Sequence, residues 1–153
     1  MGQQQLLLIV LGVIIVGIAV VVGLTLFQNS MAEMNRNALI NDVVNLASKA
    51  QRHYKVSSYL GGGCNQDFDG LTLSIGEQEN NNGSFRFTTP AASATKVLSA
   101  PSAVVGNTIV PASSSTTTLY ITGYGTEKGD DGVNLVQVYA TVTGNSLSTS
   151  VVN

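Results

Sequence analysis

The chain opens with a long apolar run. Residues 6–24 contain no polar side chain, and the run continues through Thr25 and Leu26 to Phe27. A helix needs about 20 apolar residues to cross a bilayer, so this segment is long enough to span a membrane. It is longer than the apolar core of a cleaved signal peptide and no small-residue cleavage site follows it, so we expect it to persist in the mature chain.

After Phe27 the apolar positions recur at steps of three and four residues, which is the spacing of one helix face. No Pro or Gly interrupts residues 24–60, and Gly61-Gly62-Gly63 supplies a stop. The pattern therefore predicts one helix from about Gly2 to about Ser57, apolar all round in its first half and on one face in its second. We expect the seam between this face and a globular part to contain Leu39, Val43, Leu46, Ala50 and Tyr54.

From Gly70 onward the pattern alternates with a period of two, which is typical of strands. Turn-forming Asn, Asp and Gly residues at 80–83 and 127–132 separate the alternating runs. The Pro-punctuated stretch 91–118 indicates irregular structure or short strands. Strands are expected over residues 71–75, 85–88, 119–124 and 133–143, with a last edge strand over 146–152.

These elements predict an α+β fold, in which a long N-terminal α-helix packs on a C-terminal antiparallel β-sheet. The first half of the helix, apolar all round, needs lipid or identical helices around it. The expected domains are an apolar helix at 1–28, its amphipathic continuation at 29–60 and a β-rich globular head at 61–153.

Composition and charge reduce the number of functions that the chain could have. Only 10% of the residues are charged and the formal net charge is −2, whereas about a quarter of an average soluble domain is charged. A nucleic-acid-binding face needs clustered Lys and Arg, so no nucleic-acid partner is expected. The single cysteine, Cys64, excludes an intramolecular disulfide and a CxxC metal site, and we expect it to be dispensable.

The first ionisable side chain is that of Glu33. Exported apolar segments normally carry Lys or Arg on their cytoplasmic side, which sets their orientation. We expect a short basic leader, removed before Met1, to supply that charge, with a start at the initiator methionine as the alternative.

Three motifs are weak candidates for metal binding or catalysis. Asp67-Phe68-Asp69-Gly70 and Asp130-Asp131-Gly132 begin like calcium loops but lack the further oxygen ligands that such loops require, so we interpret both as turns. His53 and Cys64 have no evident third group to orient a base. No metal and no catalytic residue is therefore expected.

Two stretches are candidates for glycosylation. Asn82-Gly83-Ser84 fits the N-linked sequon. Ser114 and Thr117 belong to a Ser- and Thr-rich run suited to O-linked sugar.

The chain resembles the type IV pilin family. The residues that carry the resemblance are Gln3-Gln4-Gln5 followed by the apolar stretch 6–15, which lead into the amphipathic half of the helix. In the family, small or polar residues and an acidic fifth position precede the apolar helix. Here Gln5 stands at that position, no proline interrupts the helix and the C-terminal cysteine pair is absent. The first and third of these departures indicate a divergent bacterial branch or an archaeal one.

The resemblance implies a structural subunit that polymerises through its apolar helix, with neither cofactor nor catalytic activity. Its partners would be copies of itself, the inner membrane before assembly, a prepilin peptidase and an assembly machinery, and its final location an extracellular filament. Residues expected in the filament core and its register are Met1, Gln5, Leu8, Ile14 and Phe27. The alternatives are a secretion-system pseudopilin and a monomeric, membrane-anchored binding domain.

Overall fold

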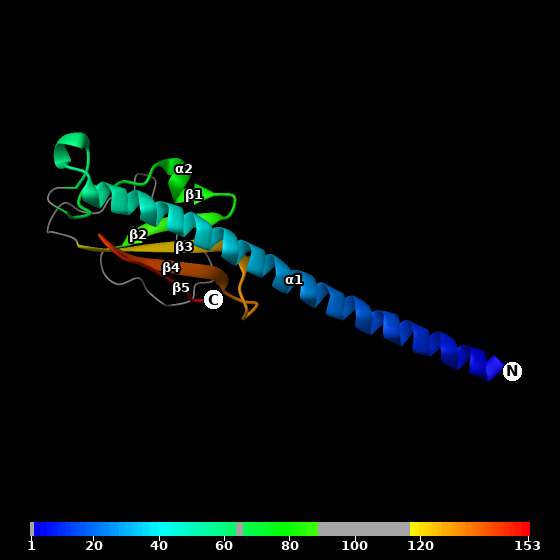
Figure 1. The fold of residues 1–153 in the computed structure, drawn as a ribbon. Coiled ribbons are helices and arrows are strands. Elements are labelled where there is room, and N and C mark those ends of the chain that lie inside the picture. The colour runs from blue at the N-terminus through cyan, green and yellow to red at the C-terminus, as the bar shows by residue number, and fades with distance from the viewer. Residues whose placement is uncertain (1, 64–65, 89–116) are drawn as a thin grey trace. The chain divides into compact units, whose positions relative to one another are not determined.

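A computed structural model describes residues 2–63, 66–88 and 117–153. The chain divides into two compact units, Met1–Met31 and Ala32–Asn153. Its elements, labelled in Figure 1, are α1 (Gly2–Lys55), η1 (Ser58–Leu60), α2 (Ile75–Gln78), β1 (Glu79–Asn80), β2 (Gly83–Thr88), β3 (Thr118–Lys128), β4 (Leu135–Thr143) and β5 (Leu147–Val151). The expected α+β fold, a long N-terminal helix with a C-terminal antiparallel sheet, is confirmed.

Helix α1 ends at Lys55, close to the expected end at Ser57. Beyond it, Gly61 adopts a φ of +82°, a left-handed conformation that glycine accepts without strain. The backbone N–H of Gly63 donates to the carbonyl of His53 at 3.0 Å, which satisfies a carbonyl of the last turn. The helix therefore ends six residues before the glycine run, with η1 between them, and the chain then folds back on the last turn of α1.

The five strands form one sheet in the order β1-β2-β3-β4-β5, each antiparallel to the next. The two longest strands, β3 and β4, pair at its centre. Strand β3 extends to Lys128, beyond its expected end, and β4 begins at Leu135 rather than at Val133. The carboxylate of Asp131 explains the later start, because it accepts hydrogen bonds from the N–H groups of Val133 and Asn134 and holds both in the turn.

The strand expected over residues 71–75 does not form. Leu71 and Leu73 are buried, as their alternation predicts, but Ile75 is 78% exposed and begins helix α2. Glu77 accepts hydrogen bonds from the backbone N–H of Ser74 at 2.9 Å and from its hydroxyl at 2.8 Å. This contact favours a helix start, so the Ser-x-x-Glu pattern prevails over the alternation.

The core of the second unit lies between the amphipathic part of α1 and one face of the sheet, and Figure 1 shows that part of α1 running along β2 and β3. On β4 the alternate residues Val136, Val138, Ala140 and Val142 share one face, and all four are buried. From the helix and from β3 and β4 the core contains Ala32, Leu39, Val43, Leu46, Ala47, Ala50, Leu119, Ile121, Val136, Val138, Ala140 and Val142.

Glycines in β2 and β3 let the helix approach the sheet closely. A Cβ on Gly123 would lie 3.1 Å from Val43 Cγ2, and one on Gly83 would lie 3.0 Å from Leu39 Cδ2. Both distances are tighter than ordinary van der Waals contact. The missing side chains therefore make room for Leu39 and Val43.

Candidate functional site

The first unit exposes its apolar surface on all sides. Every side chain from Gly2 to Met31 is exposed, and the large apolar ones between Leu6 and Phe27 are between 49% and 68% accessible. Successive helical residues point about 100° apart, so a run without polar positions leaves no polar face. Its length and composition would allow this part of α1 to cross a membrane.

The backbone of this segment is suited to an apolar environment. Helical hydrogen bonds satisfy its N–H and C=O groups internally, and the hydroxyl of Thr25 donates to the carbonyl of Val21 at 3.0 Å. Leaving one large apolar side chain in water instead of burying it costs about 1.5–3 kcal/mol. A surface of this extent therefore requires lipid or protein to cover it.

The residues expected in a filament core lie on this surface. Gln5, Leu8, Ile14 and Phe27 are all exposed, whereas Met1 lies outside the described residues. No described residue accepts from or donates to the Gln5 side chain. The amide thus has hydrogen-bonding capacity that the described part of its own subunit does not use.

The residues expected at the helix–sheet seam, in contrast, are covered by the rest of the second unit. Leu39, Val43, Leu46 and Ala50 are buried, and Tyr54 packs half-buried against the same core. The ring of Tyr54 lies 5.0 Å from that of Phe68 between centroids. The apolar stripe of residues 39–54 is therefore already covered within the subunit, while the apolar surface of residues 6–27 is not.

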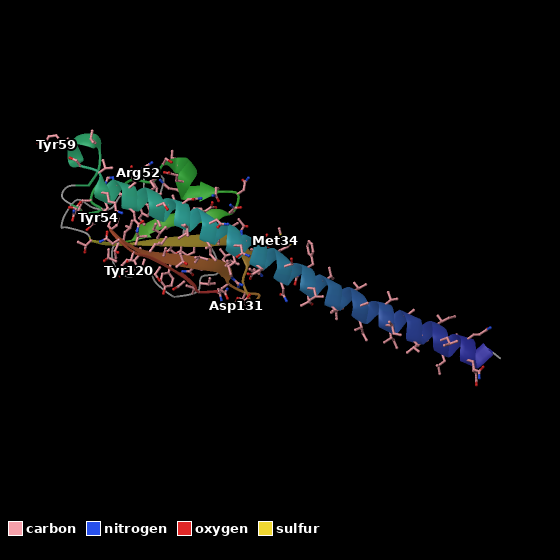
Figure 2. The ribbon with its side chains drawn as sticks, viewed as in Figure 1. Met34, Arg52, Tyr54, Tyr59, Tyr120 and Asp131 are labelled. Atoms are coloured by element: carbon pink, nitrogen blue, oxygen red, sulfur yellow. The ribbon has the colours of Figure 1, made fainter. Side chains whose placement is uncertain are left out.

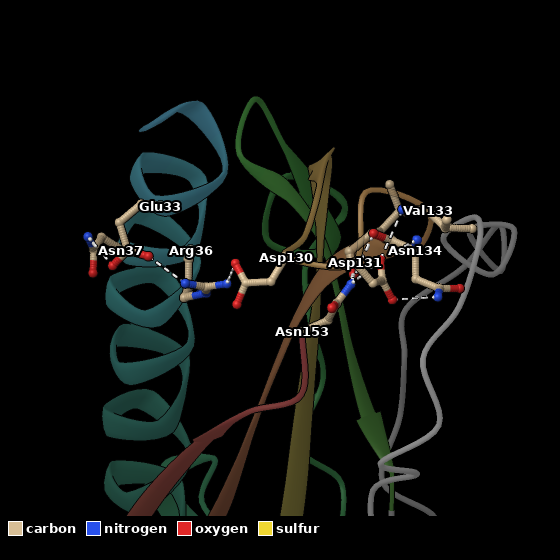
Figure 3. Close-up of polar contacts among 9 residues, drawn as sticks. Glu33, Arg36, Asn37, Asp130, Asp131, Val133, Asn134 and Asn153 are labelled. Carbon is tan, nitrogen blue, oxygen red and sulfur yellow. Dashed lines mark hydrogen bonds and ion pairs between the residues drawn. The ribbon is translucent and has the colours of Figure 1, made fainter. Parts of the chain in front are cut away.

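A salt bridge connects α1, just before this stripe, with the β3–β4 turn. The guanidinium of Arg36 donates to Asp130 Oδ1 at 2.7 Å and also contacts the carboxylate of Glu33 (Figure 3). The hydrogen bond with Asp130 is the main reason why the pKa of Arg36 is raised. The β3–β4 turn is thus held to α1 by a salt bridge, whereas the strands of the sheet are held to α1 by apolar contacts.

The candidate calcium turn at Asp130-Asp131-Gly132 is organised by its own chain. The side-chain amide of Asn134 and the backbone N–H groups of Val133 and Asn134 hold the pKa of the Asp131 carboxyl well below its usual range. The amide of Asn153 also donates to this carboxylate, at 3.2 Å (Figure 3). Within residues 2–63, 66–88 and 117–153, no group of three His, Cys, Asp or Glu side chains is placed to hold a metal ion.

The other two motifs also make local contacts. Asp67 Oδ1 accepts from the backbone N–H of Asp69 at 3.2 Å, as in a turn. His53 Nε2 lies 3.0 Å from the carbonyl of Asp69, and since a carbonyl only accepts, this nitrogen is the donor. Cys64 lies outside the described residues.

A cavity of about 340 Å³ adjoins the last turns of α1. Lys49, Arg52 and His53 line it together with loop residues that include Gly61 and Gly70. Lys49 is engaged with the carboxylate of Glu77 at 2.6 Å. These groups provide positive charge, but the described lining holds no nucleophile paired with a base.

The glycosylation candidates differ in accessibility. Asn82 is half-buried, and its Nδ2, the atom to which a sugar would be attached, donates to Asp42 Oδ2 at 2.8 Å. Thr117 is exposed just before β3, and Ser114 lies outside the described residues.

Sequence reasoning missed two features of the seam. Gly123 and Gly125 lie inside a strand, where isolated glycines often mark close approach of another segment, and this signal was available. The pairing of Arg36 with Asp130 joins residues 94 positions apart, and nothing in the local pattern of either residue predicts it.

Comparisons with protein-family models, with curated proteins and with solved structures give no match.

Proposed function

We propose that the chain is the structural subunit of an extracellular filament of the type IV pilin kind, which polymerises through the first half of α1. The observation that carries the proposal is the contrast between the two halves of this helix. The apolar stripe at residues 39–54 is buried within its own subunit, whereas the surface at residues 6–27 is apolar all round and uncovered.

Lipid and identical helices can both cover such a surface, and a filament subunit uses them in turn. Before assembly the segment would lie in the inner membrane, and after assembly it would pack against the same segments of other copies. Because Gly2 to Ala32 contain no ionisable side chain, the transfer leaves no charged side chain of this segment buried without a partner. A leader peptidase and an assembly machinery are the further partners of this cycle.

The β-rich head would form the filament surface. Its contacts with the helix satisfy the amphipathic half, so the head does not need the apolar segment in order to complete its core. Its few charged residues reduce repulsion between copies packed at high density.

Two other functions use the same architecture. A secretion-system pseudopilin would polymerise into a short periplasmic piston, and a membrane-anchored binding domain would remain monomeric. For a plain anchor, crossing the bilayer is sufficient, and it does not require a long helix whose second half is built into the head.

Fractionation of the native host separates the three functions. Filaments are sheared from intact cells, collected by centrifugation, imaged by electron microscopy and analysed by mass spectrometry. The proposal expects this chain as a main component of extracellular filaments. Recovery only in the cell envelope as a multimer would favour the pseudopilin, and recovery only as a membrane-bound monomer would favour the anchored domain.

A further inference from the structure

One end of the second unit combines exposed cations with exposed apolar side chains. Tyr59 is 97% and Leu60 80% accessible in η1. Just before them, Arg52 and Lys55 are both exposed. No described carboxylate lies within 4.0 Å of either cation. We call these four residues the cationic tip.

The other end of the same unit combines exposed carboxylates with exposed apolar side chains. Met34 is 70% and Val133 54% accessible. The side chains of Glu33 and Asp130 beside them are 56% and 75% accessible. We call these four residues the acidic tip. Both carboxylates also contact the guanidinium of Arg36 in the same subunit, so these three groups together keep one net negative charge.

The two tips lie at opposite ends of the second unit. Figure 2 shows Met34 and Asp131 together at one end, with Arg52 and Tyr59 toward the other. Positions 34 and 52 belong to the same helix, where 18 residues correspond to about 27 Å. A single copy of this unit therefore cannot bring its own two tips together.

We propose that the cationic tip of one copy docks on the acidic tip of the next copy in the polymer. This inference rests on the proposed function. A contact between two different surfaces of one chain is heterologous, and it continues from copy to copy instead of closing as a symmetric dimer does. Opposite charges favour this pairing, whereas cationic-to-cationic or acidic-to-acidic pairing would bring like charges together.

The apolar members supply the attraction that charge alone does not. Exposed salt bridges contribute little because water and salt screen them. Tyr59 is a large, amphipathic side chain of the type that dominates protein interfaces. Its burial against Met34 or Val133 of another copy would remove apolar surface from water on both sides, with the charged groups setting the orientation.

Cysteine cross-linking on assembled filaments tests the contact. In a Cys64→Ser chain, Tyr59→Cys and Val133→Cys are introduced together, and filaments are oxidised and run on a non-reducing gel. The inference expects a ladder of covalent multimers, since each copy carries both partners. Each single variant should give no ladder.

The matched control replaces the tyrosine position by another highly accessible apolar one. Ile75→Cys with Val133→Cys should give no ladder, because Ile75 is 78% exposed but lies on α2, outside both tips. A ladder from this control pair as well would mean unspecific collision and would overturn the inference.

A charge swap gives a second readout. Lys55→Glu should lower the yield of sheared filaments several-fold, and adding Glu33→Lys to the same chain should restore it. Because Glu33→Lys also removes the contact with Arg36 of the same subunit, its effect on the yield is measured with and without Lys55→Glu. If Lys55→Glu assembles fully, or if Glu33→Lys has the same effect in both backgrounds, the charge pairing is wrong.

The outcomes separate the inference from the proposed function. Filaments that contain this chain but give no ladder from positions 59 and 133 overturn the docking contact alone. If the double-cysteine chain does not assemble, the charge-swap experiment alone tests the docking contact. Absence of this chain from every filament fraction of the native host overturns both proposals.

Discussion

Gly83 of β2 and Gly125 of β3 lie directly opposite each other in the sheet, and both face Leu39 of α1. A Cβ on Gly83 would lie 3.0 Å from Leu39 Cδ2, and one on Gly125 would lie 3.1 Å from Leu39 Cδ1. On Gly83 it would also collide with the backbone carbonyl of Tyr124, which cannot rotate away. The pair forms a depression in the sheet that receives one leucine of the helix.

Gly83→Ala should therefore destabilise the second unit. The added methyl group forces strand β2 away from either Tyr124 or the helix, and overpacking of this kind costs about 1–3 kcal/mol. Urea unfolding of the full chain in detergent micelles, followed by tyrosine fluorescence, measures the change. The substitution keeps the Asn82-x-Ser84 sequon intact, so an effect on glycosylation does not confuse the result.

The control is Gly76→Ala in helix α2. A Cβ there would have no neighbour within 4 Å, and alanine is the better helix former by about 1 kcal/mol. We expect unchanged or slightly higher stability. Equal destabilisation by both substitutions would show that the depression under Leu39 is not the cause.

Much of the fold could be predicted because its patterns are long. The helical period continues from Leu39 to Tyr54, and the alternation in β4 continues from Val136 to Val142. Several successive repeats of the pattern therefore support each of these two elements. The error at residues 71–75 arose where the pattern was short. Three alternating apolar residues also fit a buried loop, and the Ser74–Glu77 contact directed the chain into a helix.

For the candidate site, too, some features could be predicted from the sequence and others could not. The uncovered apolar surface is a property of composition, so residues such as Ile14 could be identified without a structure. The contacts of Asn35 and Arg36 with distant turns could not, because they depend on how the chain folds back on itself. Asn35 Nδ2 donates to the carbonyl of Asn82 at 2.8 Å, and neither residue belongs to a pattern that points to the other.

Acid should destabilise the second unit through Glu77 and Asp131. Burial alone would raise the pKa of Glu77, but hydrogen bonds from Lys49 and Ser74 outweigh it and lower the pKa. The pKa of Asp131 is also lowered, chiefly by the Asn134 side chain. A carboxylate whose pKa is lower in the folded state stabilises the fold above its unfolded pKa and loses that contribution as the pH falls through the folded pKa.

The free energy of unfolding should consequently decrease as the pH falls below about 4, where unfolded carboxylates protonate. Urea midpoints of the full chain between neutral and acidic pH measure the slope. Glu77→Gln should make this slope shallower, while Glu79→Gln, which changes an exposed carboxylate of β1, serves as the control. An identical slope in wild type and Glu77→Gln would contradict the assignment.

Ile14→Asp should abolish filaments. Ile14 lies in the middle of the uncovered surface, where neither lipid nor a neighbouring helix offers water or a partner for a carboxylate, and the cost is at least about 2.5 kcal/mol per copy. The measurement is the amount of chain in sheared extracellular material, relative to the amount in whole cells. Ile14→Leu, which keeps size and polarity, should assemble as the wild type does, and normal filaments from Ile14→Asp would contradict a buried filament core.

Gln5 tests how far the resemblance to pilins extends. Its side chain is exposed and no described residue hydrogen-bonds to it, so in a filament core its amide must find partners outside that part of its own subunit or remain unsatisfied at a cost of about 1–3 kcal/mol. We expect the amine of Met1, in the same or an adjacent copy, to be one such partner, since a buried ammonium also needs oxygen acceptors. Gln5→Glu keeps an acceptor at this position and Gln5→Leu removes it, so we expect Gln5→Leu to reduce the yield of sheared filaments more than Gln5→Glu does. If Gln5→Leu assembles normally while Gln5→Glu fails, position 5 contributes only apolar packing, and its analogy with the acidic fifth residue of pilins is wrong.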